Sequence, residues 1–416
     1  MWNRWRTRIL LFLAVLGPGF ITANVDNDSG GIFTYSQAGA QYGYTLLWTM
    51  IPITIALIVV QEMCARMGVV TGKGLSDLIR EEFGLRITVV LMVLLVVVNY
   101  TNVVTEFIGI AGSLHLFHVA KFISVPVCAL LVWFLVFRGD YKSTEKIFLA
   151  ASLVYIAYIF AGVLSQPSWH DALLATVKLP ANSVWRDKAY IYMAIGVVGT
   201  TIAPWMQFYL QSSIVEKGIR VKDYSASRLD VIVGSFFTDL IAWFIVVACA
   251  ATLFVHGMGA IQVAADAAEA MRPLAGDYAF ILFAFGLFNA SLFAASILPL
   301  STAYTVCEGL GVESGVDKSF REAPFFYWLY ALLIAGGAVT VLVLPDAQLI
   351  NVAIFSQVLN GVLLPVVIIL MLLLINRTDL MGKYKNSRLW NWIAWSTSII
   401  VIGMTFAMLW GMIPGH

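Results

Sequence analysis

The sequence predicts an all-α integral membrane protein with eleven transmembrane helices, organised as one transmembrane domain over residues 1–416. Three observations lead to this prediction. Hydrophobic residues make up 60% of the chain, charged residues make up only 12%, and long apolar stretches recur from one end to the other. A soluble domain is about 45–50% apolar and about 25% charged, so this composition places the chain in a lipid bilayer.

Each predicted helix is an apolar stretch near or above the ~20 residues that a membrane-spanning helix needs. The first follows three arginines, as in a signal peptide, but no small-residue cleavage site comes after it, so we interpret it as a retained helix. The eleven spans, of which the first and sixth are interrupted, cover residues 9–40, 45–66, 88–113, 121–137, 146–165, 189–216, 229–256, 278–305, 324–344, 347–375 and 392–412.

The basic residues predict the orientation of these spans. With a cytoplasmic N-terminus, about four in five of the 25 Lys and Arg residues fall in cytoplasmic connections or helix ends. Enrichment of Lys and Arg on the cytoplasmic side is the usual orientation signal. An odd number of spans then places the C-terminus outside, and we expect a multi-pass protein of the plasma (inner) membrane.

The first span is interrupted by two acids and two adjacent glycines. Asp26 and Asp28 lie inside it, followed by Gly30 and Gly31. An acid at the centre of a lone helix costs about 2.5–3.5 kcal/mol on insertion scales. Because glycine tolerates non-helical backbone, we expect the chain to unwind at the glycine pair. Unwound backbone at membrane depth must be enclosed by protein or line a cavity, so the acids are candidate ligands.

The sixth span is interrupted at Pro204, which donates no backbone hydrogen bond and disfavours helix at Ala203. Carbonyl groups near Thr200 then become acceptors for a hard cation. Glycine and proline are also common in ordinary membrane helices, but matched interruptions in two halves indicate inverted repeats with a site at the midplane. The predicted repeats are residues 9–165 and 189–375, and the helix over 392–412 is additional.

Motifs in the first two spans resemble the Nramp divalent-metal transporters. They are residues 17–20 (GPGF), 37–44 (QAGAQYGY) and 65–73 (ARMGVVTGK), on either side of the acidic break. The resemblance covers most of the chain. It implies a LeuT-type fold, with spans one to five and six to ten as inverted repeats, and transport of a divalent metal ion.

Departures from the family pattern bear on the substrate. Residues 28–31 read DSGG where the family has DPGN, so the ligating Asn is replaced by Gly31. Residues 203–205 read APW where the family has MPH, so the thioether ligand and the adjacent His are absent. The resemblance places the family's carbonyl ligand at Thr200, and it matches Gln357 in span ten to a further ligand.

Span three departs in the same way. The family carries an Asp and a Glu three residues apart on a proton route; this chain keeps Glu106 but has Val103 at the Asp position. We favour Glu106 as a lining residue of the ion path over a vestige of that route. The predicted metal-site positions are Asp26, Asp28, Gly31, Thr200, Ala203 and Gln357, and the predicted lining residues are Asn99, Asn102, Glu106, Trp205 and Asn360.

This pattern resembles the Nramp-related magnesium transporters. A thioether favours soft transition metals, whereas carboxylate, carbonyl and water suit Mg²⁺, which usually keeps several waters. Gly31 and Ala203 remove two ligands and leave room for a partly hydrated ion. We therefore expect Mg²⁺, and also Mn²⁺, as transported substrates, with no cofactor.

The absence of the family's histidines and of one acid argues against proton coupling, because proton-driven transporters need titratable relays in the membrane. A divalent ion gains about 4.6 kcal/mol per 100 mV of inside-negative potential, a bias on the order of 10³ in concentration. We expect an uncoupled carrier driven by the membrane potential.

Other functions stay open at this stage. A proton-coupled Mn²⁺/Fe²⁺ transporter is the alternative of the same class. An organic-solute transporter of the LeuT type is disfavoured, because acids at the break repel a substrate carboxylate. An intramembrane aspartyl protease needs two juxtaposed carboxylates, for which Asp28 and Asp239 are the candidates, but neither lies in a Gly-x-Gly-Asp context. Outside the protease hypothesis, Asp239 either has a functional role as an acid within the membrane or serves as a structural hydrogen-bond partner.

Composition excludes several partners and cofactors. The net charge is +1 and no block of like charge is present, so nucleic-acid binding is not indicated. The four cysteines are far apart in the sequence and lack zinc-ligand spacing. The expected partners are a divalent metal ion and the lipid bilayer; no obligatory protein partner and no enzymatic activity are indicated.

Overall fold

The structure of the protein is a computed structural model that describes residues 17–137, 141–181, 187–258, 261 and 264–411. All regular secondary structure within those ranges is helical. Residues 9–16 of the first predicted span, residue 412 of the last, and the N-terminal arginines lie outside the described residues.

The first half of the chain forms the helices of predicted spans one to five and of their connections. They are α2 (Pro18–Val25), α3 (Ser29–Tyr42), the 3-10 helix η1 (Gly43–Thr49), α4 (Met50–Thr71), α5 (Leu75–Phe83), α6 (Leu85–His115), α7 (Lys121–Phe137), α8 (Tyr141–Val154), α9 (Ile156–Leu164) and α10 (Trp169–Val177). Of these, α5 and α10 lie in connections outside the predicted spans.

The second half contains the remaining predicted spans. Its elements are α11 (Lys188–Thr201), α12 (Pro204–Glu216), the 3-10 helix η3 (Val221–Asp223), α13 (Tyr224–Cys249), the π-helix η4 (Ala250–Phe254), α14 (Ala264–Leu310), α15 (Pro324–Val343), α16 (Asp346–Ile375), α17 (Thr378–Met381), the 3-10 helix η5 (Gly382–Tyr384) and α18 (Arg388–Gly411).

Eight helical segments within the described ranges are long and apolar enough to cross a membrane, and α7 is a shorter apolar helix. The eight include one continuous stretch, Ser29–Thr71, because η1 joins α3 to α4 without an interruption. Each of the eleven predicted spans contains at least one helix, with α2 and α3 sharing the first and α11 and α12 the sixth.

Glycine and proline act differently within the long helices. α14 starts earlier than the predicted eighth span and changes direction at Gly276, whose φ of 87° is readily accessible only to glycine. Pro126 in α7 and Pro365 in α16 lie inside continuous helices. Proline in a membrane helix is tolerated where neighbouring groups satisfy the freed backbone carbonyl.

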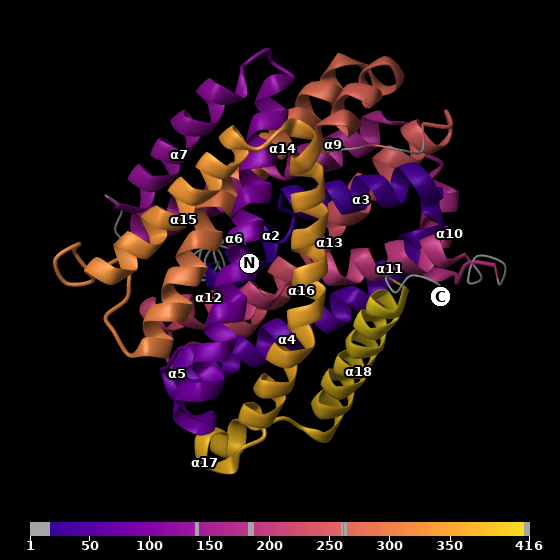
Figure 1. The fold of residues 1–416 in the computed structure, drawn as a ribbon. Coiled ribbons are helices and arrows are strands. Elements are labelled where there is room, and N and C mark those ends of the chain that lie inside the picture. Colours follow the sequence, from indigo (N-terminus) through magenta and orange to yellow (C-terminus); the bar gives the residue numbers. More distant parts are fainter. Residues whose placement is uncertain (1–16, 138–140, 182–186, 259–260, 262–263, 412–416) are drawn as a thin grey trace, which may run out of the picture.

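The helices enclose a core that holds the broken segments at its centre. α6 packs against α14 and α16, and α13 packs against α2, α3 and α4. α5 and α17 lie at one end of the molecule and the connection between α6 and α7 lies at the other (Figure 1). Large apolar side chains such as Val90, Phe122 and Leu130 are exposed on α6 and α7. Apolar surface of this kind fits contact with lipid.

Candidate functional site

The break in the first span lies between α2 and α3, at Asp26, Asn27 and Asp28. The expected unwinding at the glycine pair is wrong in position, because Gly30 and Gly31 form part of the first turn of α3 and have ordinary negative φ angles. The acids themselves occupy the non-helical segment. Buried polar side chains can satisfy the backbone here, so the glycines are not needed for unwinding.

Asp28 is the N-cap of α3. Its backbone is extended (φ −71°, ψ −177°), and Oδ1 accepts a hydrogen bond from Gly31 N at 2.7 Å. A carboxylate at this position is favoured by the positive end of the helix dipole. Because the cap uses Oδ1, Oδ2 is the oxygen that can ligate an ion. Asp28 is 8% exposed.

Gln357 of α16 reaches the same end of α3. Its Oε1 accepts a hydrogen bond from Thr200 Oγ1 at 3.2 Å. Its Nε2 lies so close to Gly30 that a Cβ atom at that position would overlap it. Gly30 therefore permits a close approach of the amide to the backbone of α3. The structure brings Asp28, Thr200 and Gln357 together, from three elements, and we call these three residues the Asp28 cluster.

The break in the sixth span lies at Ile202 and Ala203, between α11 and α12. Pro204 starts α12, and Ala203 has extended backbone (φ −79°, ψ 144°), as predicted from the proline. Thr200 is in the last turn of α11, where carbonyl groups have no partner within the helix. The hydroxyls of Tyr35 and Thr201 share a hydrogen bond of 2.8 Å, which fastens α3 to α11.

Glu106 of α6 lies on the other side of the first break. Its Oε2 accepts a hydrogen bond from Ser29 N at 3.1 Å, in the turn that Asp28 caps. Its Oε1 is buried and has no partner among the described residues. Glu106 interacts electrostatically with Asp28. That Glu106 lines the ion path stays a prediction; the structure places it beside Ser29 and Asp28.

The other predicted lining residues form contacts between helices. Asn102 of α6 and Asn360 of α16 exchange two amide hydrogen bonds of 3.0 Å each. Asn99 Nδ2 donates to Thr302 Oγ1 of α14 at 2.8 Å, and the carbonyl of Trp205 accepts from Ser301 Oγ of α14 at 3.2 Å. Asn99 and the backbone carbonyl of Trp205 thus contact α14.

Gly31 is more constrained than the sequence indicates. A Cβ atom there would lie 2.6 Å from the carbonyl oxygen of Asp26 and 3.4 Å from Asp28 Oδ1. A larger side chain would require the backbone of the break to move. The missing side chain of Gly31 therefore leaves no free space for a hydrated ion. Such space has to come from the small side chain of Ala203 and from the backbone path of residues 26–28.

Sequence reasoning missed Asp230 of α13. Its carboxylate accepts backbone hydrogen bonds from Gly17 N at 3.0 Å, Gly19 N at 2.8 Å and Phe20 N at 3.2 Å, and so caps α2 from another helix. Beside it, Lys217 forms an ion pair with Glu145 at 2.5 Å. An acid in a predicted membrane span was the available signal for Asp230.

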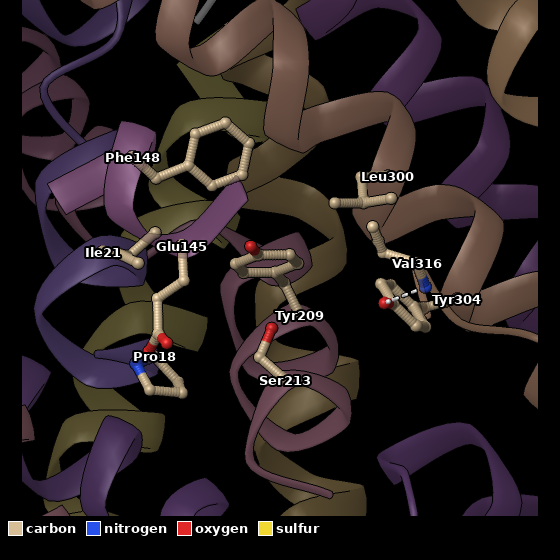
Figure 2. A pocket seen from close by; sticks show the side chains of 9 residues that line it. All are labelled: Pro18, Ile21, Glu145, Phe148, Tyr209, Ser213, Leu300, Tyr304 and Val316. Atoms are coloured by element: carbon tan, nitrogen blue, oxygen red, sulfur yellow. Dashed lines mark hydrogen bonds between the residues drawn. The ribbon is translucent and has the colours of Figure 1, made fainter. Parts of the chain in front are cut away.

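A small cavity lies beside the start of α2 (Figure 2). Pro18 and Ile21 of α2 line it, with the Glu145 carboxylate beside Pro18 and Tyr209 of α12 facing them. On its far side the Tyr304 hydroxyl accepts a hydrogen bond from a backbone amide. The cavity therefore lies between α2, α8, α12 and α14, at the end of α2 remote from the break.

No group of three or more His, Cys, Asp or Glu side chains that could hold a metal ion occurs among the described residues. The cysteines are free and buried. An ion at the Asp28 cluster would therefore be bound by one carboxylate, amide and carbonyl oxygens, and water. Such a set of oxygen ligands suits a hard cation.

The helices and the paired breaks form a membrane protein with the LeuT-type fold. A manganese transporter of Eremococcus coleocola has a TM-score of 0.77 at 20% identity, over 99% of this chain and 90% of that one. Mhp1, a nucleobase-cation-symport-1 family transporter, has a TM-score of 0.60 at 13% identity, over 95% of this chain and 92% of that one. At these identities the likeness establishes the fold.

The chain belongs to the Nramp family, whose profile, described as natural resistance-associated macrophage protein-like, matches residues 19–411. It is similar to two proteins named divalent metal cation transporter MntH. The one from Nostoc sp. is 27% identical over 419 residues, covering 96% of this chain and 92% of the relative. The one from Deinococcus radiodurans is 26% identical over 422 residues, covering 98% and 91%. The predicted family resemblance is confirmed.

Proposed function

We propose that the protein carries a divalent metal ion, Mg²⁺ and also Mn²⁺, across the plasma membrane into the cell. The observation that carries the proposal is the convergence of Asp28, Thr200 and Gln357 at two broken helices. Relatives named for divalent metal or manganese transport support the substrate class. The role is transport, not catalysis.

The preference for Mg²⁺ follows from the ligands that the chain lacks. Ala203 stands where the family has a thioether, and Gly31 stands where it has an amide. A soft ligand is absent, and the remaining oxygen donors are too few to strip the ion of its water. Mg²⁺ loses water reluctantly, so a partly hydrated ion is the substrate that this set suits.

We propose that transport proceeds by alternating access of two inverted repeats, residues 9–165 and 189–375, with the N-terminus in the cytoplasm and the C-terminus outside. The membrane potential drives uptake without a coupled proton. The gain of about 4.6 kcal/mol per 100 mV for a divalent ion is sufficient for accumulation.

Ion uptake into proteoliposomes tests this function. We expect Asp28→Ala to lose a charged ligand worth about 1.5–3 kcal/mol, so that Mg²⁺ affinity falls roughly 10- to 100-fold. Gly199→Ala is a matched control, because a Cβ atom at Gly199 meets nothing within 4 Å. Undiminished Mg²⁺ flux in Asp28→Ala would refute the proposed site.

A second candidate is a proton-coupled Mn²⁺ transporter. The specific observation in its favour is Glu106, whose Oε1 is buried without a partner and which interacts electrostatically with Asp28. A pH-sensitive dye inside the liposomes separates the candidates. Acidification that tracks Mg²⁺ or Mn²⁺ uptake supports coupling, and a constant internal pH supports the uncoupled carrier.

A further inference from the structure

The break between α2 and α3 has a second face, which lies against α13. Asn27 Nδ2 donates to the carbonyl oxygen of Thr238 at 3.0 Å and to its hydroxyl at 2.7 Å. Asp26 precedes Asn27 and Asp239 follows Thr238, so both acids lie beside this contact. The two carboxylates interact electrostatically.

Both acids are buried with little compensation from neighbouring polar groups. Asp26 is 3% exposed and Asp239 is 4% exposed, and none of their carboxylate oxygens accepts a hydrogen bond from the described residues. The neighbouring Thr54 hydroxyl interacts with the Asp239 carboxylate, but it also donates to Met50 O at 2.7 Å. No Lys or Arg in the described ranges forms an ion pair with either acid.

The other acids of the core differ in this respect. Asp28 accepts from Gly31 N, Glu106 accepts from Ser29 N, and Asp230 accepts from three backbone amides. Buried charges are normally paired, hydrogen-bonded or bound to a metal. Among the described residues, neither Asp26 nor Asp239 forms an ion pair or accepts a hydrogen bond from a backbone amide.

Two neutral oxygens at the same junction are also buried without a partner, Asn27 Oδ1 and Ser235 Oγ. Both side chains are fully buried. Ser235 precedes Asp239 by one helical turn and therefore lies on the same face of α13. These oxygens are independent of the acids, and they add hard donors of the kind that a divalent cation takes.

We propose that Asp26 and Asp239, together with Asn27 Oδ1, form a second divalent-cation site beside the Asp28 site. Two carboxylates balance the charge of one divalent ion, and retained water completes its coordination. Asp26 and Asp28 flank the same residue, so an ion can pass between the two positions without crossing apolar surface. The inference rests on the proposed function, because the transported ion is also the ligand of this site.

Counting bound Mn²⁺ by equilibrium dialysis of the purified full-length chain tests the site. We expect about two ions per wild-type chain at saturation and about one in Asp239→Asn. Asp223→Asn is the matched control, because this residue starts the same helix, is exposed, and makes no side-chain cap bond. The control should bind as many ions as the wild type. One ion per wild-type chain, or an unchanged count in Asp239→Asn, overturns the proposal.

Electron paramagnetic resonance of the Mn²⁺-loaded wild type gives an independent test of the site. Two neighbouring Mn²⁺ ions broaden each other's signal, so we expect broadening at saturation that is lost in Asp28→Ala, which retains one ion. An unbroadened spectrum at saturation also overturns the proposal. Failure of the proposed function is separate: it appears as absent uptake, and dialysis counts ions whether or not they are transported.

Discussion

At the scale of single residues, the site depends on small side chains that allow polar groups to approach. Gly30 makes room for the side-chain amide of Gln357. The backbone N–H of Gly31 donates the hydrogen bond that the Asp28 carboxylate accepts. The sequence indicates that these glycines matter, but for a different reason, since unwinding occurs at the acids before them. A glycine pair signals both close approach and flexibility, and only the positions of neighbouring helices distinguish the two.

Substitution of Gly30 tests this role. In Gly30→Ala the new Cβ atom displaces the Gln357 amide, which removes about 1 kcal/mol of ligand interaction. We expect the KM for Mg²⁺ uptake to rise about fivefold. Gly199→Ala introduces the same methyl group into open space and should leave KM unchanged. Equal KM values for the two variants would contradict the assigned role of Gly30.

At the scale of helices, polar contacts fix how the broken segments sit against their neighbours. Asp230 caps α2 from α13, and the Lys217–Glu145 ion pair lies beside Gly17. These contacts hold the start of α2 in place. The Asn102–Asn360 pair joins α6 to α16.

Removing the charge of Asp230 should loosen α2. In Asp230→Asn the amide nitrogen faces one of the backbone donors, which we expect to destabilise the fold by about 1–3 kcal/mol. Ile21 lines the cavity beside α2, so a cysteine introduced there should react faster with a thiol reagent when Asp230 is replaced. Asp223→Asn serves as the control. An unchanged labelling rate would show that Asp230 does not restrain α2.

A double-mutant cycle measures how much the Asn102–Asn360 contact contributes to the stability of the fold. Replacing each residue by Ala, alone and together, should give a coupling energy of about 0.6–1.7 kcal/mol in thermal unfolding, because interhelical hydrogen bonds in membranes have that strength. Additive effects of the two substitutions would mean that the reciprocal amide pair contributes nothing to stability.

At the scale of the whole molecule, hydrophobicity predicts the long apolar helices but not the short helices α5, α10 and α17 in the connections. Each span must satisfy its backbone hydrogen bonds within the bilayer, which is why the apolar stretches are helical. The breaks at Asp26–Asp28 and Ala203 are also visible in the sequence, from acids and from Pro204. Contacts between distant segments are not: nothing local indicates that Asp230 caps α2 or that Asn27 bonds to Thr238. Those contacts depend on how α13 packs against α2 and α3.

We propose that a divalent ion crosses the membrane at Asp28, driven by voltage. The most direct measurement is Mg²⁺ uptake into proteoliposomes at potentials set by potassium gradients and valinomycin, with a pH dye inside. We expect uptake that rises with inside-negative potential, is strongly reduced in Asp28→Ala at Mg²⁺ concentrations near the wild-type KM, and leaves internal pH constant. Uptake that is indifferent to potential, or equal in Asp28→Ala and the wild type, would contradict it.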